Sequence, residues 1–223
     1  MQKQLIDYLS EFVTSQRLEL FNKVLENRTG YITVVMEDIY QPQNASAVLR
    51  TCDCFGIQYI HVVENQYEFT VDNEVAMGAS KWLTIQKYNR KKENSLQAVK
   101  ELKKRGYRIV ATSPHINDQL LPDFDLSKGK VALVFGSEMP GISEIIKNEA
   151  DEFLKIPMVG FTESFNLSVS AAIVLNQLTE KLKKNPAIDW KLNKDEKEEI
   201  KLQWLRNSIK SSALLEQRFL ESL

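Results

Sequence analysis

The sequence predicts an α/β protein in which a largely parallel sheet carries helices on both faces and is flanked by helical extensions. A β-branched run, YITVVMED (31–38), is followed by a helical pattern, a glycine and a second strand-like run, YIHVVE (59–64), which together form a βαβ unit. Strand-like and helical segments then alternate as far as Asn185. Such alternation implies parallel strands whose connecting helices cover both faces of the sheet.

Residues 1–29 are predicted to form an N-terminal extension of one or two helices. Apolar residues recur at helical spacing through this segment, and NRTG (27–30) supplies a glycine stop. The apolar positions are Leu5, Tyr8, Leu9, Phe12, Val13, Leu20, Phe21, Val24 and Leu25.

The first helix of the predicted core, over about 45–54, has an apolar stripe that excludes Arg50. At roughly 100° per residue the apolar positions share one face, and Arg50 falls well off it. Taken alone, Arg50 is therefore a solvated arginine on the wet face. The stripe consists of Ala45, Val48, Leu49, Cys52 and Phe55.

The rest of the core, which spans residues 30–185, continues the alternation. Further strands are predicted at 82–88, 107–113, 130–136 and 152–158, and helices at about 93–105, 143–149 and 167–184.

Residues 186–223 are predicted to form a C-terminal helical extension. After Asn185-Pro186 no strand pattern remains, and the charged segment 193–223 has a helical apolar face. The extensions could serve dimerisation or substrate capture, and the sequence leaves both open. The apolar face consists of Ile200, Trp204, Leu205 and Ile209.

Composition is that of an ordinary globular protein. At 223 residues, with 43% hydrophobic and 26% charged residues, the chain is long enough for one well-buried domain with appendages. No run approaches the roughly 20 apolar residues of a bilayer span. The N-terminus, MQKQLIDYLSEF, lacks a basic region followed by an apolar one. We therefore expect a cytoplasmic protein with no membrane association.

Metal binding and bulk nucleic-acid binding are both disfavoured. Cys52 and Cys54 point to different sides of a helix, and no Cys or His cluster has ligand spacing, so we expect reduced packing residues and no metal. A net charge of -1 argues against a protein that coats nucleic acid by bulk electrostatics. Three local basic runs, at 89–92, 103–105 and 181–184, are left as candidate patches.

Three polar or glycine-rich clusters follow predicted strands, where ligands bind in open parallel sheets. Asn44 in the first is placed as a helix N-cap. Gly136 and Gly141 in the second allow close backbone approach, and Glu138 is a loop carboxylate. The clusters are QPQNASAVLR (41–50), FGSEMPGIS (135–143) and IPMVGFTESFNLSVSAA (156–172).

Each cluster also has a purely structural interpretation. Asn44 can be a plain cap and Glu138 a loop acid, while Ser164 and Asn166 can be ordinary helix-start residues. Residue types alone do not choose between these roles and a ligand site.

Common cofactor and hydrolase motifs are absent from the sequence. GSEMPG (136–141) matches neither the phosphate-loop nor the dinucleotide-binding glycine pattern. His61 lies within a strand pattern and His115 has no evident partner, so no nucleophile with a base is apparent. The residues alone indicate an α/β ligand-binding enzyme.

In their order and spacing, three segments resemble the three sequence motifs of the SPOUT superfamily of RNA methyltransferases. The segments are NASAVLR (44–50), VALVFGSEMPGIS (131–143) and IPMVGFTESFNLSVSAA (156–172), and the similarity spans roughly 32–180. They are most similar to the TrmH-like branch, which methylates ribose 2'-hydroxyls. The resemblance implies a parallel sheet with a C-terminal trefoil knot, an exception to the rule that chains do not thread loops. It also implies a homodimer whose active site draws on both subunits.

The resemblance implies S-adenosyl-L-methionine as cofactor, bound in a bent form within the knot, largely through backbone groups. Position by position, this carries over to Thr112, Gly136, Ile156 and Phe165. Relatives commonly have leucine where Phe165 stands, so we expect a reshaped pocket wall there. No metal is required, because the sulfonium methyl group is already activated and the enzyme's task is chiefly positioning.

Five residues match the motif positions of the family's catalytic and substrate-placing residues. The family's accounts assign proton removal to the arginine, but a guanidinium is almost never neutral in a protein. Our hypothesis is that Arg50 clamps the neighbouring phosphate and lowers the cost of the developing alkoxide. A homodimer would let Arg50 point off its own core into a shared cleft. The matching residues are Asn44, Arg50, Glu138, Ser164 and Asn166.

The extensions favour tRNA as substrate. Ribosomal RNA enzymes of this branch commonly carry a separate N-terminal RNA-binding domain, whereas about 30 residues precede the core in this chain. The C-terminal helical extension makes the arrangement resemble the tRNA (guanosine-2'-O-)-methyltransferases that act on guanosine 18 of the D-loop. We expect basic residues of the extensions to contact tRNA. The candidates are Arg17, Arg28, Lys201, Arg206 and Lys210.

Three alternatives stay open. The chain could methylate ribosomal RNA or a tRNA wobble nucleotide, or it could be a non-catalytic RNA-binding relative. Retention of Asn44, Arg50, Glu138 and Asn166 together argues against the last.

Overall fold

The computed structural model describes residues 1–116, 118–137 and 139–221. The chain forms two compact units, one made of Gly30–Trp190 and the other of Met1–Thr29 with Lys191–Leu223. We describe each unit by itself.

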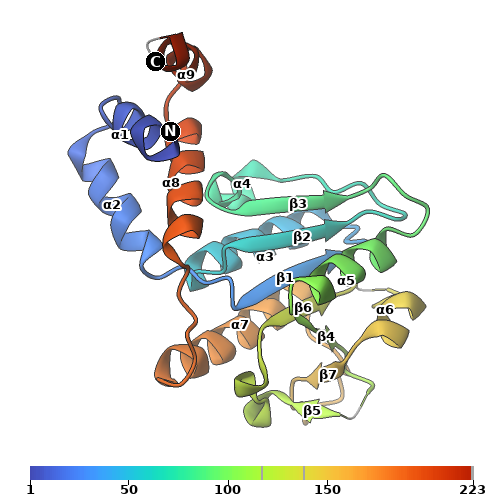
Figure 1. Ribbon diagram of the computed structural model, residues 1–223. Helices are drawn as coiled ribbons and strands as arrows, with labels where there is room; N and C mark the ends of the chain where they lie inside the picture. The colour runs from blue at the N-terminus through green and yellow to red at the C-terminus, as the bar shows by residue number, and fades with distance from the viewer. Residues whose placement is uncertain (117, 138, 222–223) are drawn as a thin grey trace. The chain divides into compact units, whose positions relative to one another are not determined.

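The larger unit contains a seven-stranded sheet in which every pair of neighbouring strands is parallel. Its strand order is β3-β2-β1-β6-β4-β7-β5 (Figure 1). The predicted α/β class is confirmed, and the six predicted strands are present. The two-residue strand β5 was not predicted, because two residues are too few to show a period. The strands are β1 Ile32–Glu37, β2 Tyr59–Val63, β3 Thr84–Tyr88, β4 Arg108–Thr112, β5 Gln119–Leu120, β6 Val131–Phe135 and β7 Glu152–Lys155.

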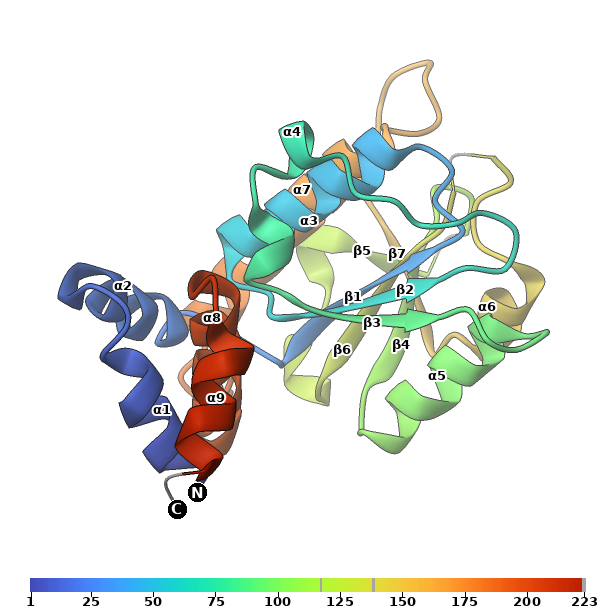
Figure 2. The same cartoon turned by 90° about the horizontal axis from the view of Figure 1, so that it is seen from above.

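Helices cover both faces of this sheet. Figure 2 shows α3 and α7 along one face and α5 and α6 on the other. The sheet has one hydrophobic core on each face, and alternate residues of β1 belong to one or the other. Val34 and Met36 lie in the core with α3 and α7, whereas Val35 lies in the core with α5 and α6. The helices are α3 Pro42–Phe55, α4 Asn73–Ala76, α5 Asn94–Lys104, α6 Glu144–Glu149 and α7 Leu167–Lys184, with 3-10 turns at Ala79–Lys81, Leu121–Asp123 and Leu126–Lys128.

Helix α3 confirms the predicted stripe and corrects the predicted start. Ala45, Val48, Leu49 and Cys52 are buried, whereas Arg50 is exposed. The helix begins at Pro42, three residues before the predicted position, because proline has no N–H to lose at a first helical position. Asn44 therefore lies inside the helix, and its prediction as the N-cap is wrong.

The described part of the smaller unit contains four helices, α1 Gln2–Ser10, α2 Ser15–Leu25, α8 Lys194–Ser208 and α9 Ser212–Glu221. Trp204 is the centre of its packing: Phe21 meets the indole ring edge-to-face at 5.4 Å, and the Arg28 guanidinium lies 5.4 Å from its centroid. Asn193 and Glu196 form a capping box at the start of α8.

No helix within the described ranges has both the length and the apolar character of a membrane span.

Candidate active site

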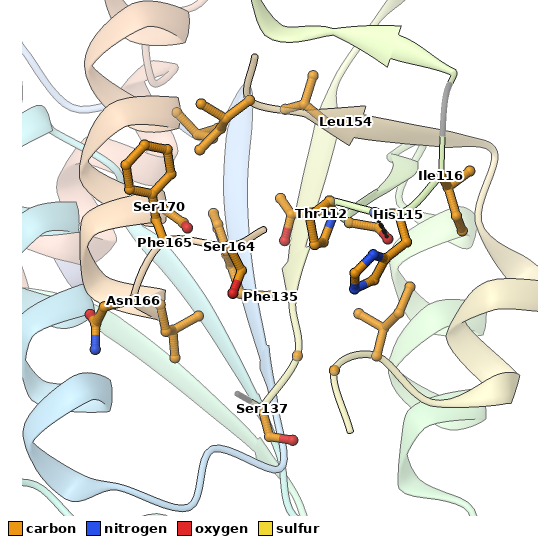
Figure 3. Close-up of a pocket in the computed structure, with 18 of the residues that line it drawn as sticks. Thr112, His115, Ile116, Phe135, Ser137, Leu154, Ser164, Phe165, Asn166 and Ser170 are labelled. Atoms are coloured by element: carbon orange, nitrogen blue, oxygen red, sulfur yellow. Dashed lines mark hydrogen bonds between the residues drawn. The ribbon is translucent and has the colours of Figure 1, made fainter. Parts of the chain in front are cut away.

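The second and third polar clusters meet the loop after β4 at the carboxyl edge of the sheet, beyond the ends of β4, β6 and β7. They enclose a cavity of about 640 Å³, a volume typical of a small-molecule site. Figure 3 shows Thr112, His115 and Ile116 along one side, facing Ser164, Phe165 and Asn166 on the other. Segments that are distant in the sequence thus share one hollow at the edge where open parallel sheets bind ligands.

The walls of this cavity combine apolar surface with hydroxyl groups. Apolar side chains come from the strand ends, the loop after β4 and α7, and hydroxyls come from the end of β4, the loops and α7. Such a lining suits a ligand that has both an apolar body and polar ends. The apolar members include Ile116, Phe135, Leu154, Ile156 and Val174, and the hydroxyl-bearing members include Thr112, Ser113, Ser137, Ser164 and Ser170.

All four predicted cofactor contacts lie in the cavity wall. Thr112 is the last residue of β4, and its hydroxyl donates a hydrogen bond to the Val134 carbonyl at 3.0 Å. This bond holds the end of β4 against β6. Ile156 follows β7 and packs against the main core, while Phe165 is only partly covered. The structure thus brings these positions together, and their role in cofactor binding stays a prediction.

Gly136, the fourth of these positions, lies where the chain folds tightly back on itself. A Cβ there would lie 2.3 Å from the carbonyl carbon of Gly141 and 2.5 Å from the nitrogen of Ile142. No side chain longer than hydrogen fits without moving backbone. Glycine is therefore required for the shape of the 136–142 loop, which forms one wall of the cavity.

Two of the predicted catalytic residues contact each other across 122 positions of sequence. The Asn166 side-chain amide donates to the side-chain Oδ1 of Asn44 at 3.1 Å, and the Asn44 amide in turn donates to the side-chain oxygen of Gln41 at 2.9 Å. Asn166 also caps α7, because its side-chain Oδ1 accepts from the Ser168 backbone N–H at 2.8 Å. The cap interpretation of Asn166 is thus confirmed, and the same side chain connects the first motif segment to the third.

The other three predicted catalytic residues have different surroundings. Ser164 lines the cavity. Arg50 is exposed on α3, outside the lining of the cavity, and no ion pair joins it to another residue in the described part of the chain. Glu138 lies outside the residues that the structure describes.

A buried carboxylate, Glu37, connects the start of this site to two helices. Its side chain is 1% exposed and accepts hydrogen bonds from the hydroxyl and the backbone N–H of Ser143 at 2.7 and 2.8 Å, and from the Ser95 hydroxyl. Ser143 is the N-cap of α6, directly after the 136–142 loop. Glu37 therefore holds that loop against the end of β1. The sequence did not single out Glu37, because a glutamate at the end of a strand gives no sign of the distant residues that it contacts.

Sequence reasoning also missed several residues of the cavity wall. Ser137 and Pro140 belong to the second motif segment, and Ser113, His115 and Ile116 follow β4. The available signal was the rule that loops after parallel strands gather at one edge, which applies to the loop after β4 as well.

The other histidine, His61, has a structural role. It lies buried in β2, and its Nδ1 is 3.1 Å from the Tyr88 hydroxyl. Burial, aided by the charge of Arg105, lowers the pKa of His61 to about 4, and burial raises the pKa of Tyr88. His61 is therefore neutral at physiological pH and is a core residue, as its strand pattern indicated.

The five basic residues predicted to contact RNA differ in their burial and in their contacts. Arg28 is 2% exposed beneath Trp204, so it has no surface to offer a phosphate, and its prediction as an RNA contact is wrong. Arg206 forms a two-point ion pair with Glu216 at 2.7 and 2.8 Å. Lys201 donates to the Asn22 side chain at 3.1 Å. The remaining two, Arg17 and Lys210, are exposed.

Within the described ranges, no group of three or more His, Cys, Asp or Glu side chains is arranged to hold a metal ion.

Comparison with known proteins identifies the family. Residues 31–176 match the model of the SpoU rRNA Methylase family, which is about two thirds of the chain. The chain belongs to this family. A SpoU relative from Borreliella burgdorferi, named tRNA (guanosine(18)-2'-O)-methyltransferase, is 39% identical over 211 residues, covering 95% of this chain and 94% of that protein.

Solved structures of SpoU proteins share the fold. The A. aeolicus TrmH/SpoU tRNA modifying enzyme superposes with a TM-score of 0.75 at 28% identity, covering 87% of this chain and 97% of that one. The SpoU methyltransferase AviRb from Streptomyces viridochromogenes, in complex with the cofactor AdoMet, gives 0.56 at 19% identity over 73% and 62% of the two chains. The resemblance read from the three motif segments is confirmed.

Proposed function

We propose that this protein transfers a methyl group from S-adenosyl-L-methionine to a ribose 2'-hydroxyl of tRNA, at guanosine 18 of the D-loop. The observation that carries the proposal is the meeting of the second and third motif segments around a cavity of about 640 Å³, with the first segment joined to the third by the Asn166–Asn44 hydrogen bond. The name of the B. burgdorferi relative supports the substrate, because the alignment with it includes both helical extensions.

The cavity fits S-adenosyl-L-methionine. Its apolar side chains suit an adenine ring and a methionine chain, and its hydroxyl groups suit their polar ends. Thr112, Gly136, Ile156 and Phe165 are the residues that would hold it. When bound, the cofactor supplies an activated sulfonium methyl group.

In this proposal, residues of α3 position the acceptor ribose. Asn44 is held between Asn166 and Gln41, so its amide presents a fixed set of hydrogen-bonding atoms at the start of α3. Arg50, on the same helix, presents an exposed planar guanidinium that can bind a phosphate at two points. A cation fixed near the developing alkoxide lowers its energy without itself losing a proton.

Three further features belong to the proposal. The active unit is a homodimer, which would bring the exposed Arg50 of one subunit toward the cavity of the other. The chain threads a C-terminal trefoil knot, as the three motif segments imply. The enzyme acts in the cytoplasm, where Arg17 and Lys210 of the helical unit contact tRNA.

Methyl transfer from radiolabelled S-adenosyl-L-methionine tests this function. Purified protein is incubated separately with bulk tRNA and with ribosomal RNA from a strain that lacks the gene. The proposal predicts label in tRNA. The family is named for the methylation of ribosomal RNA. Label in ribosomal RNA alone would therefore favour a ribosomal RNA methyltransferase and refute tRNA as the substrate. Cofactor binding without transfer to either RNA would favour a non-catalytic relative.

A further inference from the structure

A second, smaller cavity opens beside the first. It has a volume of about 200 Å³ and shares Ser137, Met139 and Leu167 with the 640 Å³ cavity. Asn44 also lines it, so the small cavity lies between the cofactor cavity and the first motif segment. The remaining members of its wall are Ile39, Tyr40, Gln41 and Tyr67.

Two tyrosines form one side of this small cavity. The rings of Tyr40 and Tyr67 meet edge-to-face, with their centroids 5.0 Å apart and their planes at 65°. Tyr40 is nevertheless 68% exposed and Tyr67 38% exposed. An aromatic pair that is ordered by its own contact yet open to solvent is available to stack on a flat ligand.

The pair is held in place by a hydrogen-bonded turn. Asp38 adopts a φ of 50°, and its carboxylate accepts from the backbone N–H groups of Asn65 and Gln66 at 2.6 and 2.8 Å. The Asn65 side chain donates to both Asp38 and Ser95. The segment after β1, which carries Tyr40, is thereby fixed to the segment after β2, which carries Tyr67.

The chemistry of the wall indicates a neutral aromatic ligand. The described residues of the small cavity include no charged side chain, which disfavours a phosphate. Its volume is below that of a typical site for a whole small molecule and suits one ring system. The amides of Gln41 and Asn44 supply donors and acceptors for the edge of such a ring.

We propose that Tyr40 and Tyr67 form a stacking platform for the nucleobase of the nucleotide that is methylated. This inference rests on the proposed function, since it assigns the base to the small cavity and thereby directs its ribose toward the shared wall and Asn44. A nucleotide must leave its stack for its ribose to reach a cofactor in a cavity, and aromatic stacking offsets part of that cost. The platform reads no sequence by itself, because every base has a flat face.

Substitutions at Tyr40 test the platform. Stacking of one base on an aromatic side chain corresponds to about a 5- to 150-fold effect on binding. Tyr40→Leu is therefore expected to lower kcat/KM for tRNA at least about fivefold, with the Kd for S-adenosyl-L-methionine and the Tm unchanged. Tyr40→Phe keeps the ring and is expected to retain near-normal kcat/KM. Leu120→Ala is the control, because Leu120 is exposed on β5 and lines neither cavity.

A spectroscopic readout separates stacking from other roles. A tRNA transcript with 2-aminopurine at position 18 is bound in the presence of S-adenosylhomocysteine, and its fluorescence is compared between wild type and Tyr40→Leu. The platform predicts quenching by wild type and by Tyr40→Phe, and clearly less by Tyr40→Leu.

The outcomes distinguish this inference from the proposed function. Normal tRNA methylation by wild type and by Tyr40→Leu would overturn the platform and leave the function intact. Equal losses in Tyr40→Phe and Tyr40→Leu would assign the effect to the hydroxyl and also overturn stacking. A weakened Kd for the cofactor in Tyr40→Leu would place the ring in the cofactor site instead. Wild-type protein that methylates no RNA would refute both the function and the platform.

Discussion

Replacing Gly136 by alanine is expected to weaken cofactor binding, because the 136–142 loop has no space for a Cβ. The added carbon would lie 2.3 Å from the Gly141 carbonyl carbon, 2.4 Å from its oxygen and 2.5 Å from the Ile142 nitrogen. Carbon atoms in ordinary contact are about 3.5 Å apart, so the opposing backbone must move by about 1 Å. All three obstructing atoms are backbone, and no side-chain rotation relieves the overlap.

The size of the effect follows from that displacement. Overpacking of this kind costs about 1–3 kcal/mol. If the cost falls on the loop conformation that binds the cofactor, the Kd for S-adenosyl-L-methionine rises about 5- to 150-fold. Calorimetric titration measures the Kd, and thermal unfolding shows whether the fold shares the cost.

A second glycine provides a matched control. A Cβ on Gly160, in the loop before α7, would have Thr162 nitrogen at 3.9 Å as its nearest neighbour, which is ordinary contact. Gly160→Ala is therefore expected to bind the cofactor as wild type does. A Gly136→Ala protein with wild-type Kd and wild-type Tm would refute the assignment of this loop to the cofactor site.

Three further predictions concern single residues. Arg50→Lys is expected to lower kcat for tRNA methylation at least about tenfold at unchanged cofactor Kd, because lysine lacks the bidentate fork; near-normal turnover would refute the clamp. Glu37→Ala is expected to lower the free energy of unfolding by about 3 kcal/mol in urea titration, because the Ser143 donors and the buried Ser95 hydroxyl lose their acceptor. A loss below about 1 kcal/mol would show that these donors find other partners. Since the pKa of folded His61 is about 4, below the ordinary value of 6.5, its contribution to stability is present above pH 6.5 and is lost as the pH falls toward 4. Between pH 7.5 and 5 the wild-type protein should therefore lose about 2 kcal/mol of unfolding free energy through His61, as measured by urea titration at each pH. The His61→Gln protein should lose about 2 kcal/mol less over the same range. Identical pH dependence in the two proteins would contradict the neutral, buried His61.

Local patterns predicted the elements of the fold well, because each depends on neighbours in sequence. The apolar stripe of α3 and the exposure of Arg50 follow from helical spacing alone. The start of α3 was misplaced because Asn44 was given the capping role, although Pro42 satisfies the first turn of the helix.

Long-range contacts were beyond the sequence. The connection of Asn44 to Asn166 spans 122 residues, and that of Glu37 to Ser143 spans 106. No sequence spacing identifies either pair as a contact, because the segments are brought together only by the order of the strands in the sheet. Arg28 was misjudged for the same reason, because an arginine stacked beneath a tryptophan looks in sequence like any surface cation.

Family resemblance supplied what periodicity did not. The residues at the carboxyl edge indicated a ligand site, but the reaction came from the order and spacing of three motif segments. The structure adds a feature that neither source indicated, the tyrosine pair beside Asn44, and it shows that the close backbone approach expected at Gly136 is made to Gly141.

Mapping the methylated ribose tests the central claim most directly. An unmodified tRNA transcript and a second transcript with 2'-deoxyguanosine at position 18 are each incubated with the protein and labelled S-adenosyl-L-methionine. The account predicts one methyl group per molecule on the 2'-oxygen of guanosine 18 in the first transcript and none in the second. Equal labelling of both transcripts, or a methyl group at another nucleotide, would contradict it.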